Sequence, residues 1–311
     1  MRNPFALVLV MLAGACAPEA APPPEAQGPP AEGTVTVEGA VLPYRIVGQG
    51  RPCIVYGSRI LYGNTYSARL ATELRCVHFD GRVFLPDAQR RDSVPHGIME
   101  AVADIEAVRA QLGLDSIVVM GNSIVGLVAM AYAATYPEHT AYAVSVAGPP
   151  SVPFASDSAE AYRARAMSPG RAAQHEVNRS RLDSLQAAHP GRGFIPTYIA
   201  NGALYWADST YDATGIFEGV LVNDTLFYDL QRTPFAWAED APPVSVPVFV
   251  ALGRHDYVVA PNVWSGVGTP FTDLTIHVFD NAGHWPHLED PAAFDTAVLE
   301  WIRRHEGGSG R

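Results

Sequence analysis

Short apolar runs alternate with segments of helical spacing along most of this chain, and that alternation constrains the fold more than any other feature. Ile54–Tyr56, Val77–Phe79 and Ile117–Met120 are typical of short, fully buried strands. Between the second and the third, Gly97–Leu112 places its apolar residues close to one helical stripe. Continuous apolar strands that alternate with helices predict a parallel sheet covered on both faces.

The sheet is expected to begin with an antiparallel pair and to contain eight strands. Thr34–Val37 and Leu42–Val47 alternate apolar and polar residues on either side of a glycine turn, which predicts the antiparallel pair. A helix is expected at Tyr66–Leu74, and an amphipathic final helix at Ala292–Arg304. Three later apolar runs complete the sheet: Ala141–Ala147, Val248–Leu252 and Leu274–Phe279.

Residues 151–243 interrupt the alternation between two core strands. The segment is rich in Ala, Arg, Asp and Tyr and has no strong strand pattern, so we predict a mostly helical cap inserted over the strand ends. The core then consists of residues 34–150 and 244–306. A flexible tail is expected at residues 307–311, where the sequence is Gly-Gly-Ser-Gly-Arg.

The N-terminal segment carries a targeting pattern. Arg2 precedes the apolar run Phe5–Leu12, which is too short to span a bilayer and predicts a signal peptide over residues 1–15. The small residues before Cys16 resemble a bacterial lipobox, which implies cleavage at that point and a lipid on the Cys16 thiol. Residues 16–33 are rich in Pro and Ala and predict a disordered tether. We therefore expect an exported, membrane-anchored lipoprotein, with a soluble secreted protein as the alternative.

The composition excludes several classes of function. The 21 residues counted as Lys or Arg are all arginines, which excludes Schiff-base chemistry, a P-loop lysine and Ser-Lys dyads. A formal net charge of −11 argues against a nucleic-acid partner, because such a surface needs a basic stripe.

Ser123 stands at a turn between a strand-like and a helix-like segment. Gly121–Gly126, with the sequence GNSIVG, follows an apolar run and precedes the helix-like Leu127–Ala131. This order is similar to the G-x-S-x-G turn that lifts a serine hydroxyl above the edge of a sheet. Val125 occupies the place of the second glycine, where a valine is expected to cost strain or to shift the helix, and Gly126 is expected to relieve it.

Two later strand ends supply a candidate acid and a candidate base. Val248–Leu252 leads through Gly253 to Asp256, and the next strand leads through a glycine loop to His284. Functional groups gather beyond the carboxyl ends of the strands of an open parallel sheet. Taken alone, each of these residues is more often a turn, cap or loop residue. Together they predict a triad with Ser123 as nucleophile, His284 as base and Asp256 as acid.

Other side chains compete for these roles. His255 adjoins Asp256, and Asp280 lies on the strand that leads to the histidine, which makes it the weaker candidate for the acid. His284 and His287 are spaced as a metal pair would be, but no third ligand stands out. We therefore expect neither a metal nor another cofactor.

These segments resemble the α/β-hydrolase fold family, which uses the same chain order of nucleophile, acid and base. The resemblance covers roughly residues 34–305 and is carried by the turn at Ser123, by Gly253–Val258 and by Ala282–Trp285. The last two segments look most like the proline-iminopeptidase branch. The resemblance implies an α/β-hydrolase fold: a mostly parallel eight-stranded sheet with helices on both faces and an inserted, mostly helical cap.

The resemblance also implies two oxyanion donors. One is the backbone N–H of Ile124, and the other is the backbone N–H of Ser58 in the loop after the third strand. The sequence at that loop is Tyr56-Gly57-Ser58, where proline iminopeptidases carry His-Gly-Gly-Pro-Gly. That difference weakens a specific aminopeptidase assignment.

The implied reaction is acyl transfer from a small-molecule ester or amide to water through an acyl-enzyme. A serine nucleophile disfavours haloalkane dehalogenases and epoxide hydrolases, which use aspartate at this position. Carboxylesterase-like activity is the leading expectation, and a catalytically inactive binding protein is one alternative. The other is an aminopeptidase, which would need cap carboxylates near Ser123, such as those of Glu160, Glu176, Glu218 or Glu239.

Cys53 and Cys76 each lie four residues before the end of their strands. If those strands are parallel neighbours, the two thiols lie side by side and within disulfide reach. An exported compartment permits the bond. The alternative is a pair of buried free thiols.

Overall fold

The computed structural model describes residues 29–86, 96–153, 156–190, 192–265 and 270–308. The predicted signal peptide, the predicted lipid site at Cys16 and most of the predicted tether lie outside the described residues. Within the described part of the chain, none of the helices combines the length and the apolar character that a membrane span requires.

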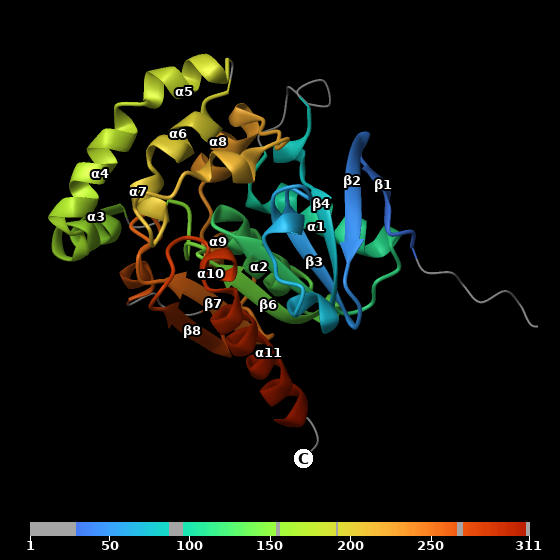
Figure 1. The fold of residues 1–311 in the computed structure, drawn as a ribbon. Helices are drawn as coiled ribbons and strands as arrows, with labels where there is room; N and C mark the ends of the chain where they lie inside the picture. Colours follow the sequence, from blue (N-terminus) through green and yellow to red (C-terminus); the bar gives the residue numbers. More distant parts are fainter. Residues whose placement is uncertain (1–28, 87–95, 154–155, 191, 266–269, 309–311) are drawn as a thin grey trace, which may run out of the picture.

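An eight-stranded sheet forms the centre of the molecule, in the order β1-β2-β4-β3-β5-β6-β7-β8 (Figure 1). β2 is antiparallel to both of its neighbours, β1 and β4, and the remaining pairs are parallel. The mostly parallel eight-stranded sheet that the sequence predicted is confirmed, including its antiparallel edge. Its strands are β1 (Glu32–Val37), β2 (Ala40–Val47), β3 (Arg51–Gly57), β4 (Leu74–Asp80), β5 (Ile117–Asn122), β6 (Thr140–Val146), β7 (Val248–Gly253) and β8 (Leu274–Phe279).

Helices cover both faces of this sheet, which explains why its central strands are largely apolar. α1 (Ile98–Gln111) packs beside α2 (Ile124–Thr135) on one face, and α11 (Pro291–Gly308) lies on the other (Figure 1). Every residue of β5 and of β7 is buried. Both strands therefore end inside the protein, and the residues that follow them are positioned by a rigid core.

The helix expected at Tyr66–Leu74 is not formed. The segment contains only a 3-10 turn at Leu70–Thr72. Ser67 Oγ accepts the N–H of Leu70, and Thr72 Oγ1 donates to the carbonyl of Arg69. Such local bonds compete with helical ones, and a segment this short cannot offset the cost of helix nucleation.

Between β6 and β7 the chain leaves the sheet and forms the cap, residues 151–243, over the carboxyl ends of the strands (Figure 1). The described part of the cap contributes no strand to the sheet, and an isolated β-bridge joins Val152 to Phe235. The cap helices are α3 (Ser156–Ala166), α4 (Pro169–Arg179), α5 (Leu182–Ala188), α6 (Phe194–Ala200), α7 (Gly202–Tyr205), α8 (Asp224–Arg232) and α9 (Trp237–Asp240).

Cys53 and Cys76 are in-register neighbours on the parallel strands β3 and β4, but both are free thiols. The disulfide considered from the sequence is therefore wrong for this structure. In-register side chains of neighbouring parallel strands project alongside each other, whereas a disulfide needs Cβ atoms that converge. Burial, with a smaller effect of the Cys76 thiol, raises the pKa of the Cys53 thiol and so disfavours the reactive thiolate.

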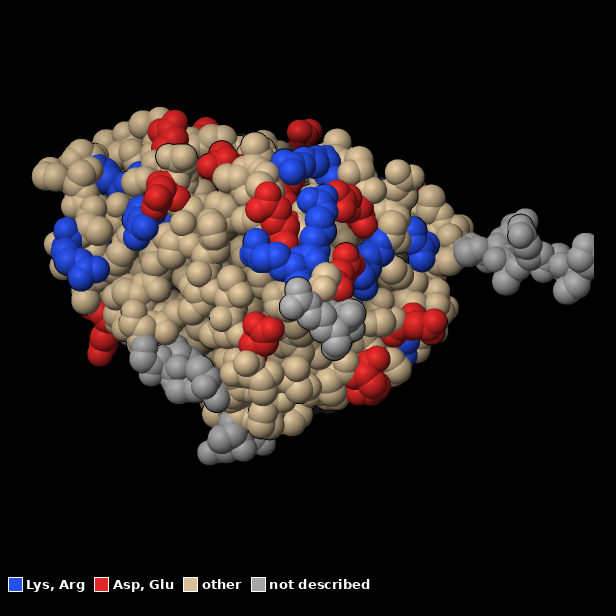
Figure 2. Space-filling view, turned by 90° about the horizontal axis from the view of Figure 1, so that it is seen from below, with Lys and Arg blue, Asp and Glu red and all other residues tan. Residues whose placement is uncertain are grey.

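The charged side chains of both signs are interspersed on the face of the molecule drawn in Figure 2. Arginine side chains stand among Asp and Glu side chains there. Ion pairs at the surface include Arg51 with Glu306 and Arg254 with Asp280.

Candidate active site

Ser123 occupies a sharp turn at the carboxyl end of β5, directly before α2. Its φ of 59° and ψ of −136° lie outside the regions that L-residues usually adopt. The backbone N–H of Ser123 donates to the carbonyl oxygen of Val146 on β6 at 2.7 Å. A strained conformation persists where its surroundings fix it, and such strain is common at functional sites.

The close backbone contacts of this turn fall at Gly121 and Gly126. A Cβ atom on Gly121 would lie 2.1 Å from the carbonyl oxygen of Val125, and one on Gly126 would lie 2.6 Å from Ser145 Oγ. Gly121 therefore has no room for a side chain against the backbone, and at Gly126 a Cβ would press on the Ser145 hydroxyl. Val125 lies within the first turn of α2, is 2% exposed and lines the adjoining pocket. Val125 is not among the described residues with a positive φ angle, and the close contacts of the turn fall at the glycines on either side of it.

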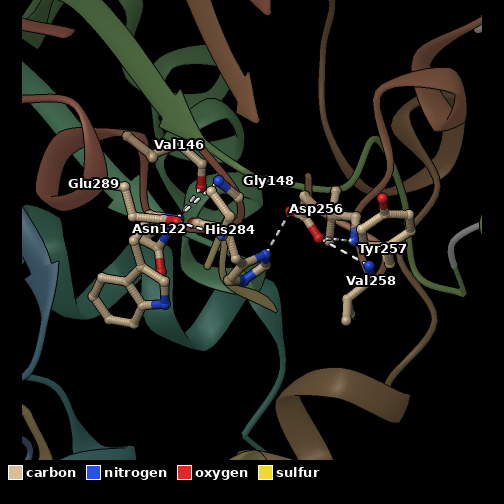
Figure 3. Close-up of polar contacts among 12 residues, drawn as sticks. Asn122, Val146, Gly148, Asp256, Tyr257, Val258, His284 and Glu289 are labelled. Carbon is tan, nitrogen blue, oxygen red and sulfur yellow. Dashed lines mark hydrogen bonds and ion pairs between the residues drawn. The ribbon is translucent and has the colours of Figure 1, made fainter. Parts of the chain in front are cut away.

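His284 and Asp256 meet beyond the ends of β7 and β8. Asp256 Oδ2 lies 2.6 Å from His284 Nδ1, and the two side chains are 0% and 1% exposed (Figure 3). Asp256 Oδ1 accepts the N–H groups of Val258 at 2.8 Å and Val259 at 2.9 Å. With these bonds the carboxylate is held in one orientation, and the imidazole donates from Nδ1 and leaves Nε2 as its basic nitrogen.

The backbone of His284 is held on both sides. Its N–H donates to the carbonyl oxygen of Tyr205 in the cap at 2.6 Å. Its carbonyl oxygen accepts from Asn122 Nδ2 at 2.9 Å, and the same amide lies 3.3 Å from the carbonyl oxygen of Val146 (Figure 3). Asn122 directly precedes Ser123, so one side chain joins the serine turn to the histidine. No sequence pattern singles out Asn122, whose only signal in the sequence is its place beside Ser123.

A pocket of about 260 Å³ adjoins Ser123 and His284, and both residues line it. Aromatic side chains from the cap and the core make up much of its wall. They are Tyr62, Phe84, Phe194, Tyr198, Tyr205, Phe217, Phe227 and Trp285. A cavity lined mainly by apolar and aromatic groups with a few convergent polar ones is the usual form of a small-molecule site.

The two residues with the expected oxyanion donors lie on different elements near this pocket, one in α2 and the other in the loop after β3. Ile124 lines it as the first residue of α2, where a helix dipole favours negative charge. Ser58 is buried in the loop after β3, and its Oγ accepts the N–H of Leu61, a neighbour that does line the pocket. In the described part of the chain, neither the Ile124 N–H nor the Ser58 N–H is a donor in the backbone hydrogen bonds that lie outside helices and strands.

Asp80, at the end of β4, anchors the loop that carries Ser58. Its Oδ1 accepts the N–H of Arg59 at 2.6 Å, and its Oδ2 lies 3.2 Å from Arg59 Nε. Burial raises the pKa of the Asp80 carboxyl to about 6, although both contacts with Arg59 act in the opposite direction. The Asp80 side chain therefore ties the loop that carries Ser58 to the end of β4.

The competing residues have other environments. Asp280 is 75% exposed and pairs with Arg254 at 2.8 Å, which leaves it outside the pocket. The buried His287 stacks on Tyr66 with ring centroids 4.5 Å apart. Burial, with a smaller effect of His284, lowers the pKa of His287 to about 3. In the ranges that the structure describes, no three His, Cys, Asp or Glu side chains are grouped as metal ligands.

Similarity to known proteins is found both in the sequence and in the fold. The sequence model of the alpha/beta hydrolase fold family matches residues 63–291. AB hydrolase superfamily protein YclE of Bacillus subtilis (strain 168) is 28% identical over 270 residues, which cover 85% of this chain and 96% of that protein. The solved proline iminopeptidase of Mycobacterium smegmatis has a TM-score of 0.65 at 20% identity, covering 89% of this chain and 99% of its own. A thermophilic esterase from Thermogutta terrifontis has a TM-score of 0.59 at 21% identity, covering 88% and 98%.

Proposed function

Because this chain belongs to the α/β-hydrolase fold family, we propose that it is a serine hydrolase that cleaves a small ester through an acyl-enzyme intermediate. The observation that carries the proposal is the buried His284–Asp256 hydrogen bond of 2.6 Å beside a pocket that Ser123 also lines. The strained serine turn is the second support. Family relatives include both an esterase and an iminopeptidase, so the fold alone leaves the substrate open.

The reaction would proceed in two acyl transfers. Ser123 Oγ attacks the ester carbonyl carbon while His284 Nε2 takes the hydroxyl proton, and Asp256 stabilises the resulting imidazolium. The N–H groups of Ile124 and Ser58 would bind the oxyanion of the tetrahedral intermediate. His284 then protonates the departing alcohol, so that the C–O bond of the ester breaks. A water molecule, deprotonated by His284, releases the carboxylic acid and restores Ser123.

The charge of the pocket favours an ester over an aminopeptidase substrate. An aminopeptidase must neutralise the substrate ammonium, and none of the described pocket-lining residues is Asp, Glu or Arg. Glu160, Glu176 and Glu218 are exposed on the cap and do not line the pocket. The side chain of Glu239 lies outside the described residues. An ammonium group in such a pocket would be desolvated without a counter-charge, which is costly.

Labelling with a fluorophosphonate probe tests the serine mechanism. The wild-type protein should take up the probe, and Ser123→Ala should not. An unlabelled but folded wild-type protein would support the alternative of an inactive binding protein. If labelling occurs, hydrolysis of p-nitrophenyl butyrate should exceed hydrolysis of prolyl and alanyl arylamides, and the opposite preference would favour the aminopeptidase.

We also propose, from the sequence pattern of residues 1–15, that the protein is exported and carries a lipid on Cys16. Intact mass of the protein from the membrane fraction tests this. The proposal predicts a chain that begins at Cys16 with added acyl mass, and an unmodified Met1 would contradict it.

A further inference from the structure

Glu289 accepts three backbone hydrogen bonds from two separate parts of the chain. It is the last residue of α10 (Pro286–Glu289). Its Oε1 accepts the N–H groups of Gly283 and Trp285, both at 3.0 Å, and its Oε2 accepts the N–H of Ala207 at 2.7 Å. Gly283 and Trp285 flank His284. One carboxylate therefore joins the histidine loop, residues 282–285, to the cap turn, residues 205–207.

The histidine loop and the cap turn also touch directly. The N–H of His284 donates to the carbonyl oxygen of Tyr205, and the rings of these two residues meet edge to face with centroids 5.1 Å apart. A Cβ atom on Gly283 would lie 2.1 Å from the same carbonyl oxygen. The backbones are thus so close that only glycine fits between them, and a shift of the cap turn would be transmitted to His284.

Arg171 of α4 fixes the cap turn from its other side. Its Nη1 donates to the carbonyl oxygens of Ala203 and Trp206, each at 2.7 Å, and its Nη2 donates to that of Ala207. The residue is 9% exposed, and its guanidinium lies 5.0 Å from the ring centroid of Tyr257. Buried charges are retained where hydrogen bonds satisfy them, so the cap turn is a fixed element against which the histidine loop can be placed.

We propose that Glu289 is a positioning residue that fixes the histidine loop to the cap turn and so sets the direction of His284 toward Ser123. The inference rests on the proposed serine-hydrolase function. Glu289 does not line the pocket and makes no contact with the reacting atoms. A displacement of about 1 Å at a catalytic group can lower the rate about 100-fold, so loss of these three bonds should act on turnover rather than on substrate binding.

Two substitutions at Glu289 separate its connection to the histidine loop from its connection to the cap turn. Glu289→Ala removes all three bonds. Glu289→Gln retains an Oε1 acceptor for Gly283 and Trp285 but presents an NH₂ donor to the N–H of Ala207, so only the tie to the cap is lost. The matched control is Asp224→Ala, because the Asp224 carboxylate likewise accepts two backbone N–H groups, those of Gly193 and Phe194, away from the histidine loop.

We expect kcat on p-nitrophenyl butyrate to fall about 100-fold in Glu289→Ala and about 10-fold in Glu289→Gln, with KM within about threefold of wild type. Asp224→Ala should keep kcat within about twofold, since the histidine loop is untouched. The His284 Nδ1 proton, bound to Asp256, should give a low-field ¹H NMR signal that shifts or broadens in Glu289→Ala and persists in Asp224→Ala. Circular dichroism confirms that each variant is folded, and Glu289→Gln replaces Glu289→Ala where the latter does not fold.

The results distinguish this inference from the proposed function. A wild-type protein that neither hydrolyses the ester nor takes up fluorophosphonate overturns the function, and the NMR signal then decides the positioning role alone. A labelled wild type, together with a folded Glu289→Ala that keeps its kcat and its low-field signal, overturns the positioning role. An equal loss of kcat in Asp224→Ala also overturns it, because the effect would then be a general loss of cap packing.

Discussion

The serine side and the histidine side of this site are held in place by different means. Ser123 is fixed by the backbone of the core, namely its own strand–turn–helix unit and the neighbouring strand β6, with glycines at two points of close contact. His284 is fixed by partners from three other segments: Asp256 after β7, Asn122 before the serine, and Tyr205 in the cap. The proposed nucleophile is thus built into the core, whereas the position of the proposed base depends on how the cap docks.

The largest loss of activity is expected from substitutions of His284 and Asp256, because the serine side and the histidine side act together in the proposed reaction. His284→Ala should lower kcat/KM for an aryl ester by roughly 10⁴-fold or more, because Ser123 loses its base. Asp256→Asn should lower it by about 10⁴-fold, because the amide favours the wrong histidine tautomer. Steady-state kinetics measure both. Near-normal turnover in either variant would show that the base or the acid is a different residue.

Alanine substitutions at Gly121 and at Gly283 test the serine side and the histidine side of the site separately. Gly121→Ala places a Cβ 2.1 Å from a carbonyl oxygen within the core, so it should lower the free energy of unfolding by about 1–3 kcal/mol or more. Gly283→Ala meets the cap turn instead, so it should reduce turnover more than stability. Urea unfolding and ester kinetics measure the two quantities.

The control for both variants is Gly170→Ala, where a Cβ would meet nothing within 4 Å. Its stability and turnover should remain close to those of wild type. If Gly121→Ala and Gly283→Ala gave the same ratio of lost stability to lost turnover, the proposed difference between the two sides would disappear.

Asn122→Ala tests the one side chain that connects the two sides. It leaves the buried carbonyl of His284 without its donor, so we expect turnover to fall about 10-fold and stability to fall by about 1–3 kcal/mol. Asn122→Asp has nearly the same shape but offers no donor, so it should be at least as impaired. Ester kinetics and urea unfolding measure these effects, and an Asp variant with wild-type turnover would argue against the hydrogen bond.

Substitution of His287, next to the histidine loop, should have a smaller effect, which is on the pH dependence of stability. Burial lowers its folded-state pKa to about 3, whereas an unfolded histidine titrates near its ordinary value of 6.5. Between about pH 3 and 6.5 the unfolded chain therefore binds the extra proton, and the His287 contribution to stability is lost as the pH falls. Urea midpoints at pH 5 and pH 7.5 should differ less in His287→Phe than in wild type. An unchanged difference would mean that His287 is not buried in the neutral form.

The smallest effect on turnover is expected from Val125→Gly, which restores the short glycine pattern at the serine. Val125 is buried in α2 without unusual backbone angles, so the substitution should not raise turnover and should cost about 1–3 kcal/mol of stability through lost burial and helix propensity. Faster hydrolysis by this variant would show that the valine does strain the turn.

Local patterns made much of the sheet predictable. The apolar strands, the antiparallel opening pair and the helix at Ile98–Gln111 follow from periodicity over neighbouring residues, and all three are found. The helix expected at Tyr66–Leu74 is absent, because side chains of Ser67 and Thr72 bind the local backbone instead. The spacing of apolar residues carries no information about those competing side-chain bonds.

The sheet, the turn at Ser123 and the chain order of serine, aspartate and histidine can all be predicted from the sequence, because each depends on short-range patterning and on the ends of parallel strands. Other features are visible only in the folded chain. Cys53 and Cys76 are free thiols there. Asn122 donates to a carbonyl 162 residues away, and Glu289 joins the histidine loop to the cap. These contacts join segments whose spacing in the chain carries no periodic signal, so they follow from packing alone.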